Sequence, residues 1–240
     1  MLKIGDRMPS FEVMDQDGNP VKSEDFIGKG RRTIIYFYPK DNTSGCTAEA
    51  CSFRDNYAAL TAAGYNIVGV SKDSAKSHTG FRAKFELPFR LLADTSTQML
   101  QDFGAWGEKK MYGKSTMGTL RRTFIFDENG ILERIIEKVD TKNAAGQIIA
   151  GMPASEKENA ERIVRIQGME AAFDRVSAAG AGAAPADVAL LKEYMDSGQW
   201  RLDYEADEAG EIPPALKRGV LSQDGLYNLL EDLEGDLNHS

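Results

Sequence analysis

The residues best suited to chemistry are Cys46 and Cys51, which are the only cysteines among the 240 residues. They follow a β-branched and aromatic run at residues 33–38, which is typical of a strand buried on both faces and which Pro39 ends. The next segment predicts a helix over residues 44–63, so Cys46 lies in its first turn. The helix dipole and the unpaired backbone N–H groups there favour the thiolate, and Cys46 is therefore predicted to react at neutral pH.

Cys51 lies five residues after Cys46 on the same predicted helix. Five residues turn a helix by about 500°, so the two side chains point roughly 140° apart and lie about 7.5 Å apart along the axis. A disulfide needs Cα atoms within about 7 Å of each other and Cβ atoms that converge. The two cysteines therefore cannot bond while the helix is intact, and a reaction between them predicts that its first turns unwind.

Two more residues before Cys46 fit a reactive thiol. Thr43 supplies a hydroxyl that can donate to the sulfur, and Pro39 can shield the site from water. The pattern Pro39-x-x-x-Thr43-x-x-Cys46 resembles the active-site signature of the peroxiredoxin family. Residues 45–55 and 103–109 resemble, more narrowly, the subgroup called bacterioferritin comigratory protein, or Q-type peroxiredoxin. The resemblance covers about residues 3–150.

This resemblance assigns roles to further residues. In the Q-type subgroup the resolving thiol follows the peroxidatic one by five residues, which matches Cys51. The family also has an arginine on a late strand whose guanidinium faces the thiolate, and Arg121 occupies that position. Arg122 is the adjacent alternative, but neighbouring residues on a strand point to opposite faces. Ser44 departs from the subgroup, which often has proline there, and is expected to loosen the loop without removing the chemistry.

The resemblance implies a thiol-specific peroxidase that reduces hydrogen peroxide and organic hydroperoxides. Cys46 would attack the peroxide and become a sulfenic acid, while Arg121 stabilises the charge and Thr43 holds the peroxide in line. Pro39 would limit over-oxidation. Cys51 would then form a disulfide with Cys46, which thioredoxin or a similar dithiol would reduce. This chemistry requires no metal, haem, flavin or other cofactor.

Other interpretations of the two thiols remain open. Cys46 taken alone could be a buried, inert side chain, and some family members lack a thiol at the position of Cys51. The same residues could serve a peroxide-sensing redox switch, which only a measurement of turnover would distinguish from an enzyme. A general thiol–disulfide oxidoreductase is expected to carry a C-x-x-C pair, which this sequence does not contain.

Hydrophobic patterning along residues 1–152 alternates between strand and helix. Strands are predicted at residues 11–14, 33–38, 66–71 and 89–94, with a late hairpin at 123–135. Helices are predicted at residues 44–63, from 73 or 74 to before 88, at 95–103 and at 143–150. Strands separated by helices indicate an α/β sandwich, and the resemblance implies a thioredoxin-like fold with a central mixed sheet flanked by helices.

The charge is unevenly distributed along the chain. Residues 1–152 hold 21 Lys and Arg against 19 Asp and Glu, whereas residues 153–240 hold 8 against 18. This difference supports a domain boundary between residues 152 and 153. The second domain is predicted to be acidic and all-helical, with helices at 155–176, 187–197 and from 222 onward, and it resembles a small bacterial helical domain of unknown function. Its role stays open between partner binding, with Trp200 and Tyr204 as anchors, and a structural cover or dimer contact.

The composition argues against several other function classes. A net charge of −8 disfavours nucleic acid as a partner. No apolar run approaches the roughly 20 residues that span a bilayer, so no membrane partner is expected. The sequence begins without the apolar stretch of a signal peptide, and we expect a cytoplasmic protein that is a monomer or a homodimer. The two histidines, His78 and His239, lie far from the cysteines and do not favour a metal site.

Several conspicuous side chains are interpreted as structural or solvated. Trp106 is expected to pack rather than to catalyse. Glu49 could form a hydrogen bond near the thiol, but a position on the helix surface is expected. His78 is expected to be solvated rather than a general base, and the acidic residues 203–208 are expected to form a solvated face rather than a metal site.

Overall fold

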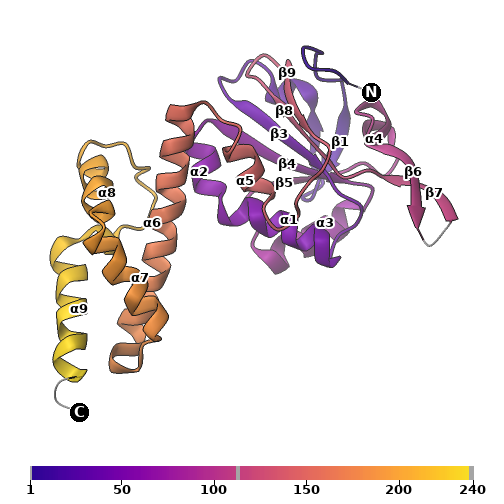
Figure 1. Cartoon of the computed structure of the whole chain (residues 1–240). Helices are drawn as coiled ribbons and strands as arrows, with labels where there is room; N and C mark the ends of the chain where they lie inside the picture. Colours follow the sequence, from indigo (N-terminus) through magenta and orange to yellow (C-terminus); the bar gives the residue numbers. More distant parts are fainter. Residues whose placement is uncertain (1, 112–113, 238–240) are drawn as a thin grey trace. The chain divides into compact units, whose positions relative to one another are not determined.

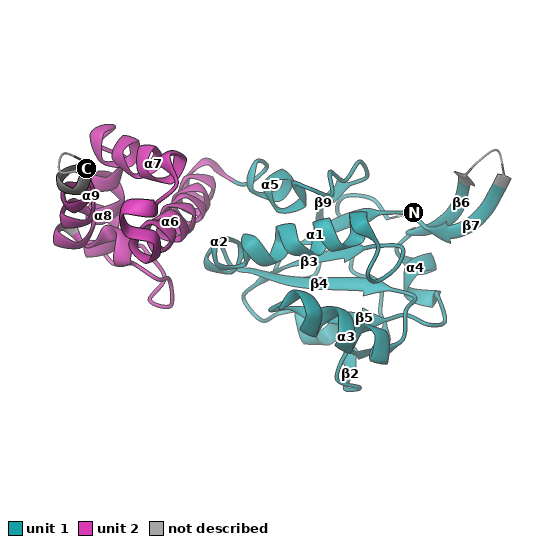
Figure 2. Ribbon diagram, turned by 90° about the horizontal axis from the view of Figure 1, so that it is seen from below, with its two compact units in different colours: residues 1–152 teal, residues 153–240 magenta. Residues whose placement is uncertain are grey.

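The computed structural model describes residues 2–111 and 114–237 (Figure 1). The chain forms two compact units, Met1–Met152 and Pro153–Ser240, which Figure 2 distinguishes by colour. In the described residues, the first unit is a sheet with flanking helices and the second contains helices without strands. The predicted fold class, a thioredoxin-like α/β sandwich followed by an all-helical part, is confirmed.

A seven-stranded mixed sheet forms the centre of the first unit, with the strand order β2-β1-β5-β4-β3-β8-β9. Strands β3, β4 and β5 are parallel, whereas β1 pairs antiparallel with β2 and β5, and β8 pairs antiparallel with β3 and β9. The strands are β1 Glu12–Asp15, β2 Pro20–Lys22, β3 Arg32–Phe37, β4 Tyr65–Ser71, β5 Arg90–Ala93, β8 Arg122–Phe126 and β9 Leu132–Ile136.

Strand β3 lies in the interior of the sheet and leads into the candidate site. Its side chains alternate between the two faces, as strand geometry requires. The ring of Tyr36 packs on Phe53 at 4.7 Å between centroids, whereas Phe37 packs on Phe103 at 5.2 Å on the other side. Both faces are therefore covered, which explains why the whole apolar run is buried.

The described residues of the first unit form the α-helices α1 Ser44–Asp55, α2 Tyr57–Ala62, α3 Ala75–Phe85, α4 Gln98–Asp102 and α5 Ala144–Ile149. Helices α1 and α3 cover one face of the sheet (Figure 1). The prediction of one helix over residues 44–63 is wrong, because the helix is interrupted at Asn56. The side chain of Asn56 donates to the carbonyl of Ser52 at 2.9 Å and competes there with the backbone.

A second, two-stranded sheet consists of β6 Trp106–Met111 and β7 Lys114–Thr119. The sequence did not predict this hairpin, because its lysines and glycines are poor strand formers. It forms through backbone pairing between the two strands, for example Glu108 with Met117.

The second unit contains the helices α6 Ala154–Ala179, α7 Pro185–Asp196, α8 Gln199–Glu208 and α9 Gln223–Leu237. Helix α8 was not predicted, and α6 continues three residues beyond the predicted end at Val176. Among the described residues, no helix is long and apolar enough to cross a membrane.

Candidate active site

Cys46 is the third residue of helix α1 and is buried, with 1% of its surface exposed. The helix begins because Thr43 adopts an extended conformation and its carbonyl accepts the first intrahelical bond, from Thr47 N–H at 2.8 Å. Backbone N–H groups in a first turn have no intrahelical acceptor. The Cys46 sulfur therefore lies at the positive end of the helix dipole, which attracts negative charge.

Arg121 lies 75 residues after Cys46 in the sequence and brings a positive charge to its sulfur. It directly precedes β8, and its Nη2 donates to Cys46 Sγ at 3.3 Å. Burial lowers the pKa of Arg121, but Glu49 and the Cys46 sulfur raise it more, so its net pKa lies above the ordinary value. The guanidinium is therefore always charged. Arg122, the alternative, instead donates to the carbonyl of Gly104 at 2.8 Å.

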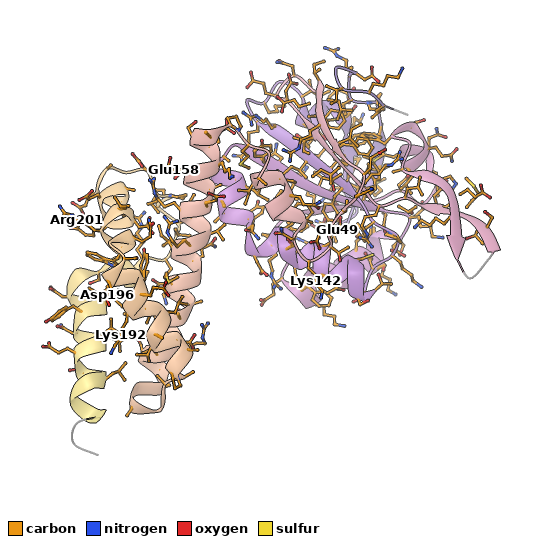
Figure 3. The ribbon with its side chains drawn as sticks, in the orientation of Figure 1. Glu49, Lys142, Glu158, Lys192, Asp196 and Arg201 are labelled. Atoms are coloured by element: carbon orange, nitrogen blue, oxygen red, sulfur yellow. The ribbon has the colours of Figure 1, made fainter. Side chains whose placement is uncertain are left out.

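Glu49 completes the group around the sulfur. It lies one helical turn after Cys46, is fully buried, and forms an ion pair with Arg121 Nη1. Figure 3 labels Glu49 among the side chains of the first unit. Its other oxygen, Oε1, has no hydrogen-bond partner within the described part of the chain. Burial raises the pKa of Glu49 to about 7, although Arg121 opposes the shift. The expectation that Glu49 lies at a solvated surface is wrong, because its side of α1 faces the sheet.

Thr43 and Pro39 both precede α1 and differ in their surroundings. The Thr43 hydroxyl donates to the carbonyl of Lys40 at 3.0 Å, so its proton is directed away from the Cys46 sulfur. Its oxygen lone pairs stay available to accept a hydrogen bond from a bound molecule. Pro39 is half-buried and directly follows the buried Tyr38, which places it at the end of the β3 segment.

A model of the AhpC/TSA family matches residues 4–135, which is more than half of the chain. The chain belongs to the AhpC/TSA family. A second model, of a domain of unknown function, DUF4298, matches residues 182–238 in the helical unit. The predicted resemblance of both parts is thereby confirmed.

Its relatives in this family are peroxiredoxins. Peroxiredoxin Bcp of Escherichia coli K12 is 42% identical over 142 residues, which are 59% of this chain and 90% of that protein. Peroxiredoxin Bcp of Bacillus subtilis is 39% identical over 148 residues, or 62% of this chain and 93% of the relative. The solved structure of the bacterioferritin comigratory protein of Xanthomonas campestris is 33% identical and superimposes with a TM-score of 0.55, covering 62% of this chain and 92% of that one. The Q-type assignment of the first unit therefore stands, and so does its peroxidase activity.

Both cysteines of the peroxiredoxin unit are free thiols on one continuous helix. Beyond the half-buried Cys51, that helix is tied to its surroundings. Ser52 Oγ accepts from Ala145 N–H of α5 at 3.1 Å, and Arg54 donates to the carbonyl of Phe85 at 3.0 Å. The end of α1 that follows Cys51 is therefore held in place by contacts outside the helix.

Histidine 78 is not solvated, contrary to expectation. It is completely buried on α3 and forms a 2.9 Å contact with Asp41 of the loop that precedes Cys46. Its sequence neighbours are polar, and only the packing of α3 against β5 turns this side chain inward. Trp106 packs against the hydrophobic core, in agreement with the expected structural role.

The acidic residues 203–208 are not uniformly solvated either. Asp203 is completely buried and accepts two hydrogen bonds from Arg165, at 2.9 and 2.6 Å, whereas Glu205 and Glu208 are exposed. No group of three or more His, Cys, Asp or Glu that could hold a metal ion occurs in the described residues.

Proposed function

We propose that Cys46 is the peroxidatic thiol of this peroxiredoxin, with Arg121 as the residue that stabilises its thiolate. The observation that carries the proposal is the 3.3 Å contact between Arg121 Nη2 and Cys46 Sγ in the first turn of α1. A helix N-terminus and a guanidinium that converge on one sulfur both favour negative charge there.

The first chemical step is nucleophilic attack by the Cys46 thiolate on one peroxide oxygen. The S–O bond forms as the O–O bond breaks, and the departing oxygen takes a proton and leaves as water or an alcohol. Arg121 stabilises the charge that develops on that oxygen. The free lone pairs of Thr43 Oγ1 support a role in orienting the peroxide, and Pro39 shields the sulfur from water and limits over-oxidation.

The second step forms a disulfide between Cys46 and Cys51. The Cys51 thiolate attacks the sulfenic sulfur, and the hydroxyl leaves as water. The geometry of an intact helix forbids this bond, so the turns around Cys46 unwind first. A thioredoxin-like dithiol then reduces the disulfide by exchange, and thioredoxin itself is our proposed reductant.

We propose residues 1–152 and 153–240 as separate domains, since each forms a compact unit. The role of the helical domain stays open. The indole N–H of Trp200 donates to the carbonyl of Val220 at 2.9 Å, and its ring stacks on Tyr204, so both residues already serve internal packing. A chain truncated after Met152 tests this domain: aggregation supports a structural cover, and intact activity and solubility support partner binding. A cytoplasmic location and a monomeric or homodimeric state stay predictions.

The test of the proposed function is NADPH oxidation coupled through thioredoxin reductase and thioredoxin to hydrogen peroxide. We expect turnover that disappears in Cys46→Ser. Cys51→Ser should consume about one equivalent of peroxide and stop as a trapped sulfenic acid, which a sulfenic-acid probe detects. Turnover that persists in Cys46→Ser would contradict the assignment. A wild type that is oxidised but does not turn over with any dithiol would favour the redox switch.

A further inference from the structure

The loop that leads to Cys46 is anchored by a buried contact between Asp41 and His78. Asp41 lies five residues before Cys46 and only 5% of its surface is exposed. Its Oδ2 lies 2.9 Å from His78 Nδ1. The ring of His78 is fully buried, and its Nε2 lies 3.1 Å from the carbonyl oxygen of Leu92 on β5.

The His78 ring bridges two acceptors. Its Nδ1 faces the carboxylate of Asp41, and its Nε2 faces the carbonyl oxygen of Leu92. A buried carboxylate is costly unless hydrogen bonds satisfy it.

Further hydrogen bonds to Asp41 are present. Its Oδ1 accepts from the hydroxyl of Tyr38 at 2.8 Å, and its Oδ2 accepts from the hydroxyl of Ser77 at 2.6 Å. Its backbone N–H donates to the carboxylate of Asp73 at 2.8 Å. Burial raises the pKa of Asp41. The hydrogen bonds from His78 and Ser77 and the charge of His78 lower this pKa by more than burial raises it, so the net pKa lies below the ordinary value.

These contacts tie one loop residue to separate elements of the fold. Tyr38 continues from β3, Asp73 and Ser77 lie at the start of α3, and His78 connects onward to β5. The backbone on the C-terminal side of Asp41 is constrained as well, because Asn42 adopts a left-handed conformation with φ 59°. The chain therefore reaches the start of α1 from a fixed point and in a fixed direction.

We propose that Asp41 and His78 are positioning residues for the peroxidase reaction, which act through the first turn of α1. With the loop anchored, the backbone N–H groups of that turn and the Cys46 sulfur stay aligned with Arg121. When α1 unwinds to form the disulfide, the anchor holds the loop and gives the helix a fixed point from which to refold. The inference rests on the proposed role of Cys46.

The test uses a Cys51→Ser background, so that Cys46 is the single thiol, and two measurements. The first is the pH profile of Cys46 alkylation by iodoacetamide, and the second is the rate constant for its oxidation by hydrogen peroxide. In Asp41→Asn and in His78→Phe we expect the midpoint of the alkylation profile to move to higher pH. We also expect the peroxide rate constant to fall on the order of tenfold, because misplacing a reacting group by a fraction of an ångström has effects of this size.

Asp94→Asn is the matched control. Asp94 is as buried as Asp41 in the same unit, but it accepts from Leu100 N–H at 2.8 Å and from Ser96, away from the loop. We expect this variant to lose stability while keeping the wild-type alkylation profile and peroxide rate. His78→Asn should restore part of the activity lost in His78→Phe, since its amide can still donate to Asp41.

Ser77→Ala is a milder variant, which tests the proposal even if the Asp41 and His78 variants fail to fold. It removes one hydrogen bond from Asp41, so a smaller shift in the same direction is expected for both measurements. Folded Asp41 and His78 variants with unchanged profiles and rates would overturn the proposal, and so would an equal loss in Asp94→Asn. Because alkylation needs no peroxide, a failure of the proposed function would leave the first measurement interpretable.

Discussion

Each of the two compact units buries a carboxylate against an arginine: Glu49 with Arg121 in the first and Asp203 with Arg165 in the second. In the helical unit the set of partners is complete. Asp203 accepts two hydrogen bonds from Arg165 and one from Tyr194 at 2.8 Å, and Gln199 lies within 3.3 Å. This pair joins α6, α7 and α8 through the partners of Asp203.

The pair in the peroxiredoxin unit is incomplete by comparison. Arg121 divides its donors between Glu49 and the sulfur of Cys46, and one oxygen of Glu49 has no hydrogen-bond partner in the described residues. The comparison teaches that a buried carboxylate–arginine pair alone does not indicate a site. What distinguishes the pair beside Cys46 is a donor shared with the sulfur and a carboxylate whose pKa burial raises to about 7.

The largest expected difference between the two pairs is in peroxide reduction. Arg121→Ala should lower the rate constant of Cys46 with hydrogen peroxide by on the order of 10²–10³, the usual cost of removing one donor to a developing negative charge. Arg165→Ala should leave this rate within about twofold, because its partners include no reacting atom. Stopped-flow oxidation of both variants measures the contrast, with Arg121→Lys as a control that keeps the charge. Equal losses of the peroxide rate constant in Arg121→Ala and Arg165→Ala would contradict the proposed difference between the two pairs.

The complete pair should matter for stability instead. Asp203→Ala leaves Arg165 and the Tyr194 hydroxyl without their acceptor, so we expect the helical unit to lose about 3 kcal/mol of unfolding free energy. Each unit contains one tryptophan, so Trp200 fluorescence in a Trp106→Phe background reports urea unfolding of this unit alone. Peroxidase activity should not change. A loss below about 1 kcal/mol would mean that the pair is no more than a surface ion pair in energy.

The smallest expected effect concerns pH and Glu49. Because its pKa is raised from 4.5 to about 7 in the folded state, folding is favoured when Glu49 is protonated. That stability is fully present below about pH 4.5 and is lost as pH rises through 7. Glu49→Gln cannot ionise, so the wild type should lose on the order of 2–3 kcal/mol relative to this variant across that range.

Unfolding of the Trp200→Phe protein with and without Glu49→Gln, followed by Trp106 fluorescence at several pH values, measures this difference. Asp203→Asn in the same background controls for a carboxylate in the other unit, and its curve should run parallel to the wild type in the Trp106 signal. A difference between Glu49→Gln and wild type that does not vary from pH 4.5 to 8 would show that Glu49 keeps its ordinary titration.

Much of the fold was predictable because its central strands are continuous apolar runs and its helices carry ordinary start and stop residues. Ser74, for example, caps α3 by accepting from Ser77 N–H, as its residue type predicts. The hairpin of β6 and β7 and the helix α8 were not predicted, because their sequences are polar and show neither period clearly. Their formation depends on backbone pairing and on packing within each unit.

Within the site, the sequence by itself determined the place of Cys46 in a helix first turn, the spacing that keeps Cys51 away from it, and the choice of Arg121. These follow from local periodicity and from a specific motif. Only the tertiary structure decided that Glu49, His78 and Asp203 are buried, since each is a polar side chain whose partner lies far away in the sequence. The partner of Glu49 is 72 residues away and that of His78 is 37 residues away. Whether a charged side chain is buried depends on such distant partners, because its burial is strongly unfavourable unless a partner satisfies its charge.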